Sequence, residues 1–456
     1  MLPRAVTQAP QGPHRRQGFS TPLTHSRRGA EELFSASKQR VTVFLSNLEG
    51  GGAERVTLNL LKGFSPERFE LELVLISATG VFLDQVPDHI KLVDLKASGV
   101  TGAILPLARY LRQRQPAVLL SHLSHVNVGA LVARRLAGTR TKVVIVEHND
   151  LSSVPRKPKT SRFVPPQRRL LPNIMRRLYR QADAVVGVSD GVSSFIKRRF
   201  NVPEALMQTI YNPVVDAGLL ERSREQPDHP WLVAQTVPTL IAVGRLNEQK
   251  DFATLLRAFA TLRERRDVRL IIFGEGPERR NLEALAQELG VAQEVSLPGF
   301  AENPYAAMRR ASLLVLSSRW EGLPTVLIEA MACGCPVVAT DCPSGPTEIL
   351  EGGRYGPLTE VGNVQGLADA ILGALAAPVS SEQLTARAAH FSFENAVASY
   401  TALLASKAPQ TSRDAAEIPT LPTAPATTKT GKRPGAPGRR VLQPRQAEGK
   451  QRGKWG

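Results

Sequence analysis

Two series of short apolar runs dominate the chain, and most runs are followed by a stretch in which apolar residues recur at helical spacing. The runs of the first series are residues 41–48, 69–76, 91–95, 117–123, 142–146 and 182–188. Those of the second series are residues 239–243, 269–273, 294–297, 312–316 and 336–340. Asp251 is placed to cap the helix that follows the first run of the second series. Strands that alternate with amphipathic helices predict an α/β protein with parallel sheets.

The two series predict two doubly wound, Rossmann-like domains, at residues 41–215 and 239–390. We interpret the polar, proline-containing segment 216–238 as the linker between them, and residues 391–406 as a last helix. Ligands of such sheets bind outside the carboxyl ends of the strands. Two domains that face each other would therefore share one inter-domain cleft.

The positive charge of the chain is concentrated at its two ends. The net charge is +17, but residues 1–40 carry +5 and residues 407–456 carry +8, which leaves +4 for the 366 residues between them. We predict that both ends are disordered basic tails. The charge raises the hypothesis of a non-catalytic protein that binds nucleic acid. The tails contain only three aromatic residues, Phe19, Phe34 and Trp455, so we do not expect a nucleic-acid partner.

Several features of the composition favour a protein of the cytoplasm. No run of eighteen apolar residues is present, and the first residues lack the apolar stretch of a secretory signal. The three cysteines, Cys333, Cys335 and Cys342, fit a reducing compartment better than a disulfide framework. Three thiols without a fourth ligand nearby do not complete a tetrahedral metal site, so we predict that they pack in the core. We expect no metal and no cofactor.

A loop with two cations follows the first strand of the second domain. It begins at Gly244 and contains Arg245 and Lys250, just ahead of a predicted helix. Two cations and a glycine at the carboxyl end of a parallel strand can bind a diphosphate. The alternative is that both cations form a solvated surface. A second glycine turn, Gly274 to Gly276, follows the next strand and is compatible with a tight turn alone.

Two glutamates surround the start of a helix later in the second domain. Glu321 and Gly322 lie in a loop, Pro324 opens the helix, and Glu329 lies in its second turn. Two carboxylates near the positive end of a helix can bind sugar hydroxyls while the free amides of the first turn meet phosphate oxygens. Taken alone, both glutamates could also be capping and surface charges.

Together these motifs resemble the retaining glycosyltransferases of family 4, also called the glycosyl transferases group 1. The resemblance rests on Arg245 with Lys250, on Glu321 and Glu329 with seven residues between them, and on the segments 336–341 and 344–348. It extends from about residue 239 to 356. It implies the GT-B fold, in which two Rossmann-like domains face each other and the final helix crosses back to the first domain.

The resemblance also implies roles for single residues. Arg245 and Lys250 would bind the diphosphate of the donor, and Glu329 the ribose hydroxyls. Glu321 would contact the donor sugar in a loop that offers the amides of Gly322 and Leu323. We interpret Glu321 as an orienting and electrostatic residue rather than a nucleophile. No carboxylate pair of the kind that binds a divalent ion in the other large transferase fold ends a strand here, so we expect metal-independent catalysis.

The first domain has motifs that agree with this assignment. A glycine loop with Gly51 and Gly52 enters the first helix, and its amides can approach a phosphate because no side chain obstructs them. The loop resembles the Gly-Gly-Ala-Glu-Arg element of family members that extend sugar chains on lipid carriers. His148 ends a strand and matches the family histidine that contacts the donor sugar. His122 ends another strand and could contact the acceptor, although the sequence slightly favours a structural role for it.

A basic stretch between residues 151 and 180 has nine Lys or Arg residues and no acid. Apolar residues are interleaved with Arg168, Arg169, Arg176 and Arg177, so the segment predicts binding to an anionic membrane surface or to a pyrophosphate-bearing lipid. The alternative is a solvated helix whose apolar side packs on its own domain.

The sequence therefore predicts a transferase that moves a sugar from a nucleotide diphosphate sugar, with UDP expected, to a hydroxyl of a lipid-linked or polysaccharide acceptor in cell-surface glycan biosynthesis. We expect it in the cytoplasm, bound peripherally to the inner face of the membrane. A nucleotide-sugar epimerase with the same fold and a non-catalytic basic binding protein are the alternatives.

Overall fold

The computed structural model describes residues 38–148 and 166–407, without the side chains of residues 166–172. Nearly all of both predicted basic tails, and residues 151–165 of the basic stretch, lie outside the described residues. The described residues fall in a single unit of the chain, which contains two sheets.

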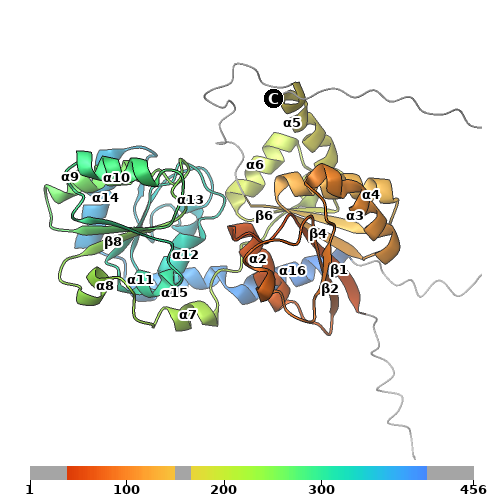
Figure 1. Cartoon of the computed structure of the whole chain (residues 1–456), viewed down its shortest axis with the longest axis horizontal. Helices are drawn as coiled ribbons and strands as arrows, with labels where there is room; N and C mark the ends of the chain where they lie inside the picture. Colours follow the sequence, from red (N-terminus) through yellow and green to blue (C-terminus); the bar gives the residue numbers. More distant parts are fainter. Residues whose placement is uncertain (1–37, 149–165, 408–456) are drawn as a thin grey trace, which may run out of the picture. The chain divides into compact units, whose positions relative to one another are not determined.

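A seven-stranded parallel sheet forms the N-terminal lobe, with the strand order β3-β2-β1-β4-β5-β6-β7 (Figure 1). Its strands are β1 (Gln39–Leu45), β2 (Phe69–Leu75), β3 (Lys91–Asp94), β4 (Val118–His122), β5 (Lys142–Glu147), β6 (Ala184–Gly187) and β7 (Met207–Thr209). The helices between them are α2 (Gly52–Gly63), α3 (Val100–Arg114), α4 (Ser124–Ala137), α5 (Pro166–Tyr179) and α6 (Asp190–Phe200). Strands β4 and β6 are buried along their whole length, and the apolar residues Val118 to Leu120 and Ala184 to Val186 that they contain fit strands covered on both faces.

A six-stranded parallel sheet forms the C-terminal lobe, with the strand order β10-β9-β8-β11-β12-β13. Its strands are β8 (Thr239–Val243), β9 (Arg269–Phe273), β10 (Val295–Gly299), β11 (Leu313–Leu316), β12 (Val337–Thr340) and β13 (Leu358–Thr359). The helices are α9 (Phe252–Arg263), α10 (Arg279–Glu288), α11 (Pro304–Arg310), α12 (Thr325–Ala332), α13 (Pro346–Ile349), α14 (Val364–Ala376) and α15 (Ser381–Ala388). Leu240 of β8 packs in one apolar cluster with α9 and α14, and Ile241 packs in another with α11 and α12. Helices therefore cover both faces of the sheet, as predicted for a doubly wound fold.

The order of the strands reverses between β1 and β4 in one sheet and between β8 and β11 in the other. In open α/β sheets a crevice forms at such a reversal, outside the carboxyl ends of the strands. His122 ends β4, and the segments that follow β1, β8 and β11 carry the glycine loop, Lys250 and Glu321.

The segment 216–238, which the sequence predicts as a linker, contains two short helices, α7 (Ala217–Arg222) and α8 (Pro230–Ala234). Leu219 of α7 and Leu232 of α8 are buried, and both helices pack against α11 of the C-terminal lobe. With 6 and 5 residues they are too short to show helical periodicity in the sequence.

Helix α16 (Phe393–Lys407) returns to the N-terminal lobe, where it packs against α2. The Nε2 of Gln39, at the start of β1, donates a hydrogen bond of 3.0 Å to the carbonyl oxygen of Leu404. Gly63, the last residue of α2, lies so close to Val397 and Phe393 that a Cβ would overlap both side chains. The helix therefore ties the end of the second lobe to the first.

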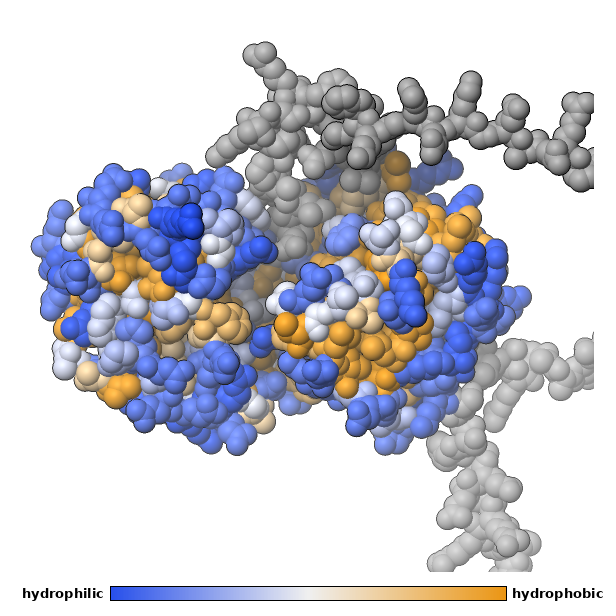
Figure 2. Space-filling model, in the orientation of Figure 1, coloured by the Kyte–Doolittle hydropathy of each residue, from blue (hydrophilic) through white to orange (hydrophobic). Residues whose placement is uncertain are grey.

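Hydrophobic residues on the surface are gathered on the N-terminal lobe beside the positions of α2 and β1 (Figure 2). Within residues 38–148 and 166–407, no single helix is long and apolar enough to cross a bilayer. One bent pair, Val364–Ala376 with Ser381–Phe391, meets the criterion by length and composition alone. Leu367, Ile371 and Leu384 of this pair are fully buried in the protein core.

Candidate active site

A cavity of about 580 Å³ is lined by residues from both lobes. The N-terminal lobe contributes the start of α2 and His148, and the C-terminal lobe contributes the loops after β8 and β11 and the start of α12. Its charged and polar lining residues include Arg55, Asn59, Lys62, His148, Asn212, Asp216, Arg222, Gln249, Lys250, Tyr305, Glu321, Thr325 and Glu329. The motifs that follow the two reversals of strand order thus meet in one place.

Lys250 and Glu321 form an ion pair in the wall of this cavity. The Nζ of Lys250 lies 2.6 Å from Oε1 of Glu321, and the two side chains are only 17% and 9% exposed. The hydroxyl of Ser318 donates a second hydrogen bond of 2.6 Å to the same carboxylate oxygen. Because both groups are largely withdrawn from water, the pair is worth more electrostatically than a surface ion pair. It holds one cation and one carboxylate at a fixed place between the loops after β8 and β11.

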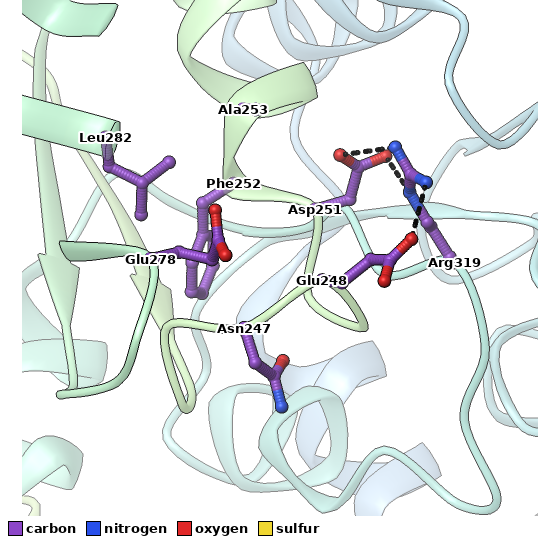
Figure 3. A pocket seen from close by; sticks show the side chains of 8 residues that line it. All are labelled: Asn247, Glu248, Asp251, Phe252, Ala253, Glu278, Leu282 and Arg319. Carbon is purple, nitrogen blue, oxygen red and sulfur yellow. Dashed lines mark hydrogen bonds and ion pairs between the residues drawn. The ribbon is translucent and has the colours of Figure 1, made fainter. Parts of the chain in front are cut away.

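The loop that presents Lys250 is braced from its other side, where a second pocket is drawn in Figure 3. The guanidinium of Arg319 contacts Oδ2 of Asp251 at 2.9 Å and a carboxylate oxygen of Glu248 at 3.6 Å. Asp251 occupies the predicted cap position of α9 but adopts a left-handed conformation with φ of 47°, and its side chain caps no backbone amide. Its carboxylate instead forms an ion pair with Arg319 and accepts a hydrogen bond from the hydroxyl of Thr254. The loops after β8 and β11 are therefore joined on both sides of Lys250.

The second glycine turn, Gly274 to Gly276, packs against the backbone of the same loop. Gly274 has φ of +143°, and a Cβ at this residue would overlap the carbonyl oxygen of Gly244. A Cβ on Gly276 would overlap the carbonyl oxygen of Leu246 in the same way. Of the two interpretations of this turn, the structure supports close packing of two backbones, which only glycine permits.

Glu329 lines the same cavity as Arg55 and Tyr305. Burial raises the pKa of the Glu329 carboxyl, while the charges of Arg55 and Lys250 and a hydrogen bond from Thr325 act in the opposite direction. Burial also raises the pKa of Tyr305 to about 12. Pro324, the residue before α12, forms no side-chain hydrogen bond to the helix, so the first amides of α12 are not capped by it. An uncapped helix start beside cations suits the oxygens of an anionic ligand.

Contacts between the lobes hold the loop that contains Gly322. The hydroxyl of Ser189, before α6, donates a hydrogen bond of 2.8 Å to the carbonyl oxygen of Gly322. The carboxylate of Glu348 in α13 accepts hydrogen bonds of 2.8 and 3.0 Å from the backbone amide of Asp190, the first residue of α6. A Cβ on Gly191 would lie 2.6 Å from the hydroxyl oxygen of Ser344, so the two backbones meet there. We call this set of contacts the α6 latch.

Two family models match the chain, one on each lobe. The model of Glycosyltransferase Family 4 matches residues 50–217, and that of Glycosyl transferases group 1 matches residues 223–391. The chain is 30% identical over 335 residues, which is 71% of its length and 87% of the relative's length, to N-acetylgalactosamine-N,N'-diacetylbacillosaminyl-diphospho-undecaprenol 4-alpha-N-acetylgalactosaminyltransferase of Campylobacter jejuni subsp. jejuni.

The chain belongs to the glycosyl transferases group 1. A second relative from the same bacterium, GalNAc-alpha-(1->4)-GalNAc-alpha-(1->3)-diNAcBac-PP-undecaprenol alpha-1,4-N-acetyl-D-galactosaminyltransferase, is 25% identical over 70% of this chain and 84% of its own. The solved structure of Anabaena Alr3699/HepE in complex with UDP has a TM-score of 0.66 at 21% identity, covering 81% of this chain and 100% of that chain. Family and GT-B fold are both as predicted from the sequence.

Within this group 1 glycosyltransferase, most predicted donor residues line the cavity. Lys250, Glu321, Gly322, Leu323, Glu329, Gly52 and His148 do so. Arg245 is exposed and does not line it, and Gly51 precedes α2 just outside the lining. The described residues contain no group of three or more His, Cys, Asp or Glu side chains that could hold a metal ion. The three cysteines are buried in the core, as predicted.

The prediction of an acceptor contact for His122 is wrong in this structure. The side chain is 0% exposed and does not line the cavity, because it lies beneath His148. Of the basic stretch, Arg176 and Arg177 are exposed on α5, whereas the side chains of Arg168 and Arg169 lie outside the described residues. The sequence reasoning missed Arg55, Asn212, Arg222 and Tyr305. For Arg55 alone a signal existed, since it ends the glycine-loop motif.

Proposed function

We propose that this glycosyltransferase moves a sugar from a UDP-sugar, with retention, to a hydroxyl of a lipid-linked or polysaccharide acceptor in cell-surface glycan biosynthesis. The family membership supports sugar transfer. The two Campylobacter relatives are named for transfer to diphospho-undecaprenol saccharides, which supports the acceptor class. The Anabaena structure contains UDP, which supports uracil as the base of the donor nucleotide.

The observation that carries the proposal is the Lys250–Glu321 ion pair in one cavity with Glu329 and the start of α12. A nucleotide diphosphate sugar needs a cation and free amides for its diphosphate, and acceptors for its ribose and sugar hydroxyls. The cavity has these groups in that combination. In this assignment Lys250 meets the diphosphate together with the amides of Gly51 and Gly52, and Glu329 binds the ribose. Arg245 is exposed outside the lining of the cavity and has no part in this assignment.

The same cavity suggests how the leaving group is stabilised. Negative charge develops on the departing diphosphate in the transition state, and a fixed cation beside it lowers the barrier. Lys250 supplies this charge next to the bond that breaks, so we propose that transfer needs no divalent ion. Addition of a chelator should therefore leave the rate unchanged.

Glu321 is best suited to orient the sugar. Its Oε1 accepts short hydrogen bonds from both Lys250 and Ser318. These bonds withdraw electron density from the oxygen, which makes the carboxylate a weak nucleophile but a well-positioned acceptor for a sugar hydroxyl. Retention would then proceed on one face of the sugar, with an oxygen of the leaving phosphate as the base. His148 and the amides of Gly322 and Leu323 would complete the contacts to the donor sugar.

We further propose that α5 brings the enzyme to the inner face of the membrane. Met175 and Tyr179 pack into the N-terminal lobe, while Ile174, 47% exposed, points outward beside Arg176 and Arg177. Exposed apolar and cationic side chains on one helix favour an anionic bilayer surface. Double replacement, Arg176→Glu with Arg177→Glu, is expected to abolish sedimentation with anionic liposomes at low salt. Equal sedimentation of the variant and the unchanged protein would contradict this role.

The donor site is tested by thermal unfolding with UDP, GDP, ADP and their common sugar conjugates. One nucleotide is expected to raise the midpoint of the unchanged protein by a few degrees, since a ligand at 100 times its Kd stabilises the folded state by about 2.7 kcal/mol. Glu329→Ala should lose this shift because the ribose hydroxyls lose their acceptor. Glu382→Ala, which alters an exposed residue of α15, should keep it.

Two outcomes would overturn the assignment. An unchanged nucleotide shift in Glu329→Ala would move the ribose site elsewhere. No shift with any nucleotide would indicate a transferase fold that serves as a binding protein.

A further inference from the structure

Two histidines lie at the carboxyl ends of the neighbouring strands β4 and β5. Nδ1 of His122 is 2.9 Å from Nε2 of His148, and the ring planes are within 27° of parallel. His148 lines the cavity, whereas His122 is 0% exposed and lies behind it. The proposed function uses His148 but gives no role to the second ring.

The hydrogen bond fixes which nitrogens carry protons. Two neutral rings that share one hydrogen bond need one donor and one acceptor. Nε2 of His122 is buried and has no hydrogen-bond partner among the described residues. A buried N–H without an acceptor is rarer in proteins than an acceptor with a free lone pair. The arrangement therefore favours a proton on Nδ1 of His122, which donates to Nε2 of His148.

The tautomer of His148 follows from that of His122. With Nε2 of His148 occupied as an acceptor, the proton of its neutral ring must lie on Nδ1. Nδ1 of His148 has no hydrogen-bond partner within residues 38–148 and 166–407. The ring lines the cavity, so this N–H is the group that remains for a ligand oxygen.

Both rings are kept neutral by their surroundings. Burial lowers the pKa of His148 to about 4. Burial, and then the neighbouring His148, hold the pKa of His122 well below its usual range. The nearest buried carboxyl, Glu147, is directed elsewhere, since it accepts hydrogen bonds from Ser124, Asn127 and Tyr179. His148 thus offers a neutral N–H rather than a positive charge.

The backbone beside His122 is strained in a way that keeps this geometry. Leu123 has φ of 76° and ψ of 133°, a conformation that side-chain-bearing residues rarely adopt. Its amide donates to the carbonyl oxygen of Val146 at 3.2 Å, and its own carbonyl accepts from Asn127 at 2.8 Å. Such strain is of order 1–3 kcal/mol and persists only where the surroundings enforce it. Here it lets β4 end with His122 beneath His148 while α4 begins two residues later.

We propose that His122 is a positioning residue that, through its Nδ1 hydrogen bond to Nε2 of His148, fixes the tautomer in which His148 presents Nδ1–H to a hydroxyl oxygen of the donor sugar. The proposal rests on the proposed function for the identity of the ligand. The tautomer itself does not depend on it, and the two can fail separately.

Nuclear magnetic resonance of protein with 15N-labelled histidine tests the tautomer without any substrate. Long-range 1H–15N correlations at pH 7.5 should show the proton of both His122 and His148 on Nδ1, with assignments made from the variants below. In His122→Phe, which keeps a ring but removes the hydrogen bond, the His148 signal should move toward an average of both tautomers. A proton on Nε2 of His148 in the unchanged protein would overturn the proposal.

Kinetics test the consequence for transfer. His122→Phe is expected to lower kcat roughly 10- to 100-fold, as for removal of a residue that orients a catalytic group, while the nucleotide thermal shift stays unchanged. His122→Asn can place an amide N–H near the position of Nδ1, so it should recover much of the rate. His89→Phe, an exposed histidine remote from the cavity, is the matched control and should be unaffected.

The two proposals are separated by their readouts. Suppose that the unchanged protein has the Nδ1–H tautomer of His148 and that a folded His122→Phe variant has a normal kcat. This result would overturn the positioning role alone. An Nδ1–H tautomer without a nucleotide shift in any variant would overturn the proposed function and leave the histidine pair as found. If His122→Phe lowers the unfolding midpoint, His122→Asn is measured in its place. The rate of His122→Asn should then exceed that of His148→Phe, which removes the cavity-lining ring itself.

Discussion

Lys250→Met is expected to lower kcat/KM for sugar transfer by about 10²- to 10³-fold, the loss typical of removing one preorganised group that stabilises transition-state charge. Lys250 is 17% exposed and 2.6 Å from the Glu321 carboxylate. Methionine keeps most of the side-chain length but removes the charge. The leaving diphosphate then loses its cation, and Glu321 is left as a buried carboxylate without a counter-ion. Steady-state kinetics with the nucleotide sugar found by thermal shift measure this loss.

A matched ion pair in the same lobe provides the control. Arg265 and Asp369 lie 2.5 Å apart on the surface, where they are 43% and 51% exposed. Arg265→Met removes the same type of charge, and the rate should stay within a factor of two, because exposed pairs contribute roughly 0–1 kcal/mol to stability. A Lys250→Met enzyme with more than half of the normal rate would exclude Lys250 from the chemistry.

Gly274→Ala is expected to lower the free energy of unfolding of the C-terminal lobe by about 3 kcal/mol or more. The added Cβ would overlap the carbonyl oxygen of Gly244, and φ of +143° disfavours any side chain. The backbone of the Lys250 loop must then move away from the turn, so the nucleotide shift should be lost with the stability. Urea unfolding, followed with and without nucleotide, measures both.

Gly373→Ala separates this effect from a general cost of replacing glycine. Gly373 lies in α14 with no atom near the position of a Cβ. Alanine has the higher helix propensity, so this variant should be more stable by about 0.5–1 kcal/mol. Equal stability of the two variants would show that the turn tolerates a side chain and that the Lys250 loop does not depend on it.

The sequence predicts the buried strands best and the short edge strands worst. All eleven predicted apolar runs correspond to strands, with boundaries that differ by up to a few residues. The prediction missed β7, whose sequence is Met-Gln-Thr, and β13, which has two residues. Neither is fully buried, so neither has the continuous apolar run by which parallel strands are identified. The helices α7 and α8 were missed because they end before a second turn repeats.

For the active site, spacing along the chain predicts which loops carry the chemistry but not which way each side chain points. Lys250 and Glu321 lie in the loops that follow the adjacent strands β8 and β11, so their meeting follows from the fold. Arg245, five residues before Lys250, lies in the same loop and yet points to solvent. His122 and His148 also end adjacent strands, but only one reaches the cavity. Leu123, the residue after His122, has a φ of 76°, and no pattern of residue types reveals this conformation.

The α6 latch allows an estimate of the free energy that one contact contributes to holding the two lobes together. Glu348 accepts hydrogen bonds from the amide of Asp190 at the start of α6, although it belongs to a different lobe, and so adds to the cap that Ser189 provides. A helix cap contributes typically about 1 kcal/mol to stability. Separation of the lobes would expose the amide of Asp190 and the carboxylate to water, which hydrates both, so breaking this cap shifts the balance between closed and open forms only about fivefold. An interaction of this size favours contact between the lobes and is still readily broken.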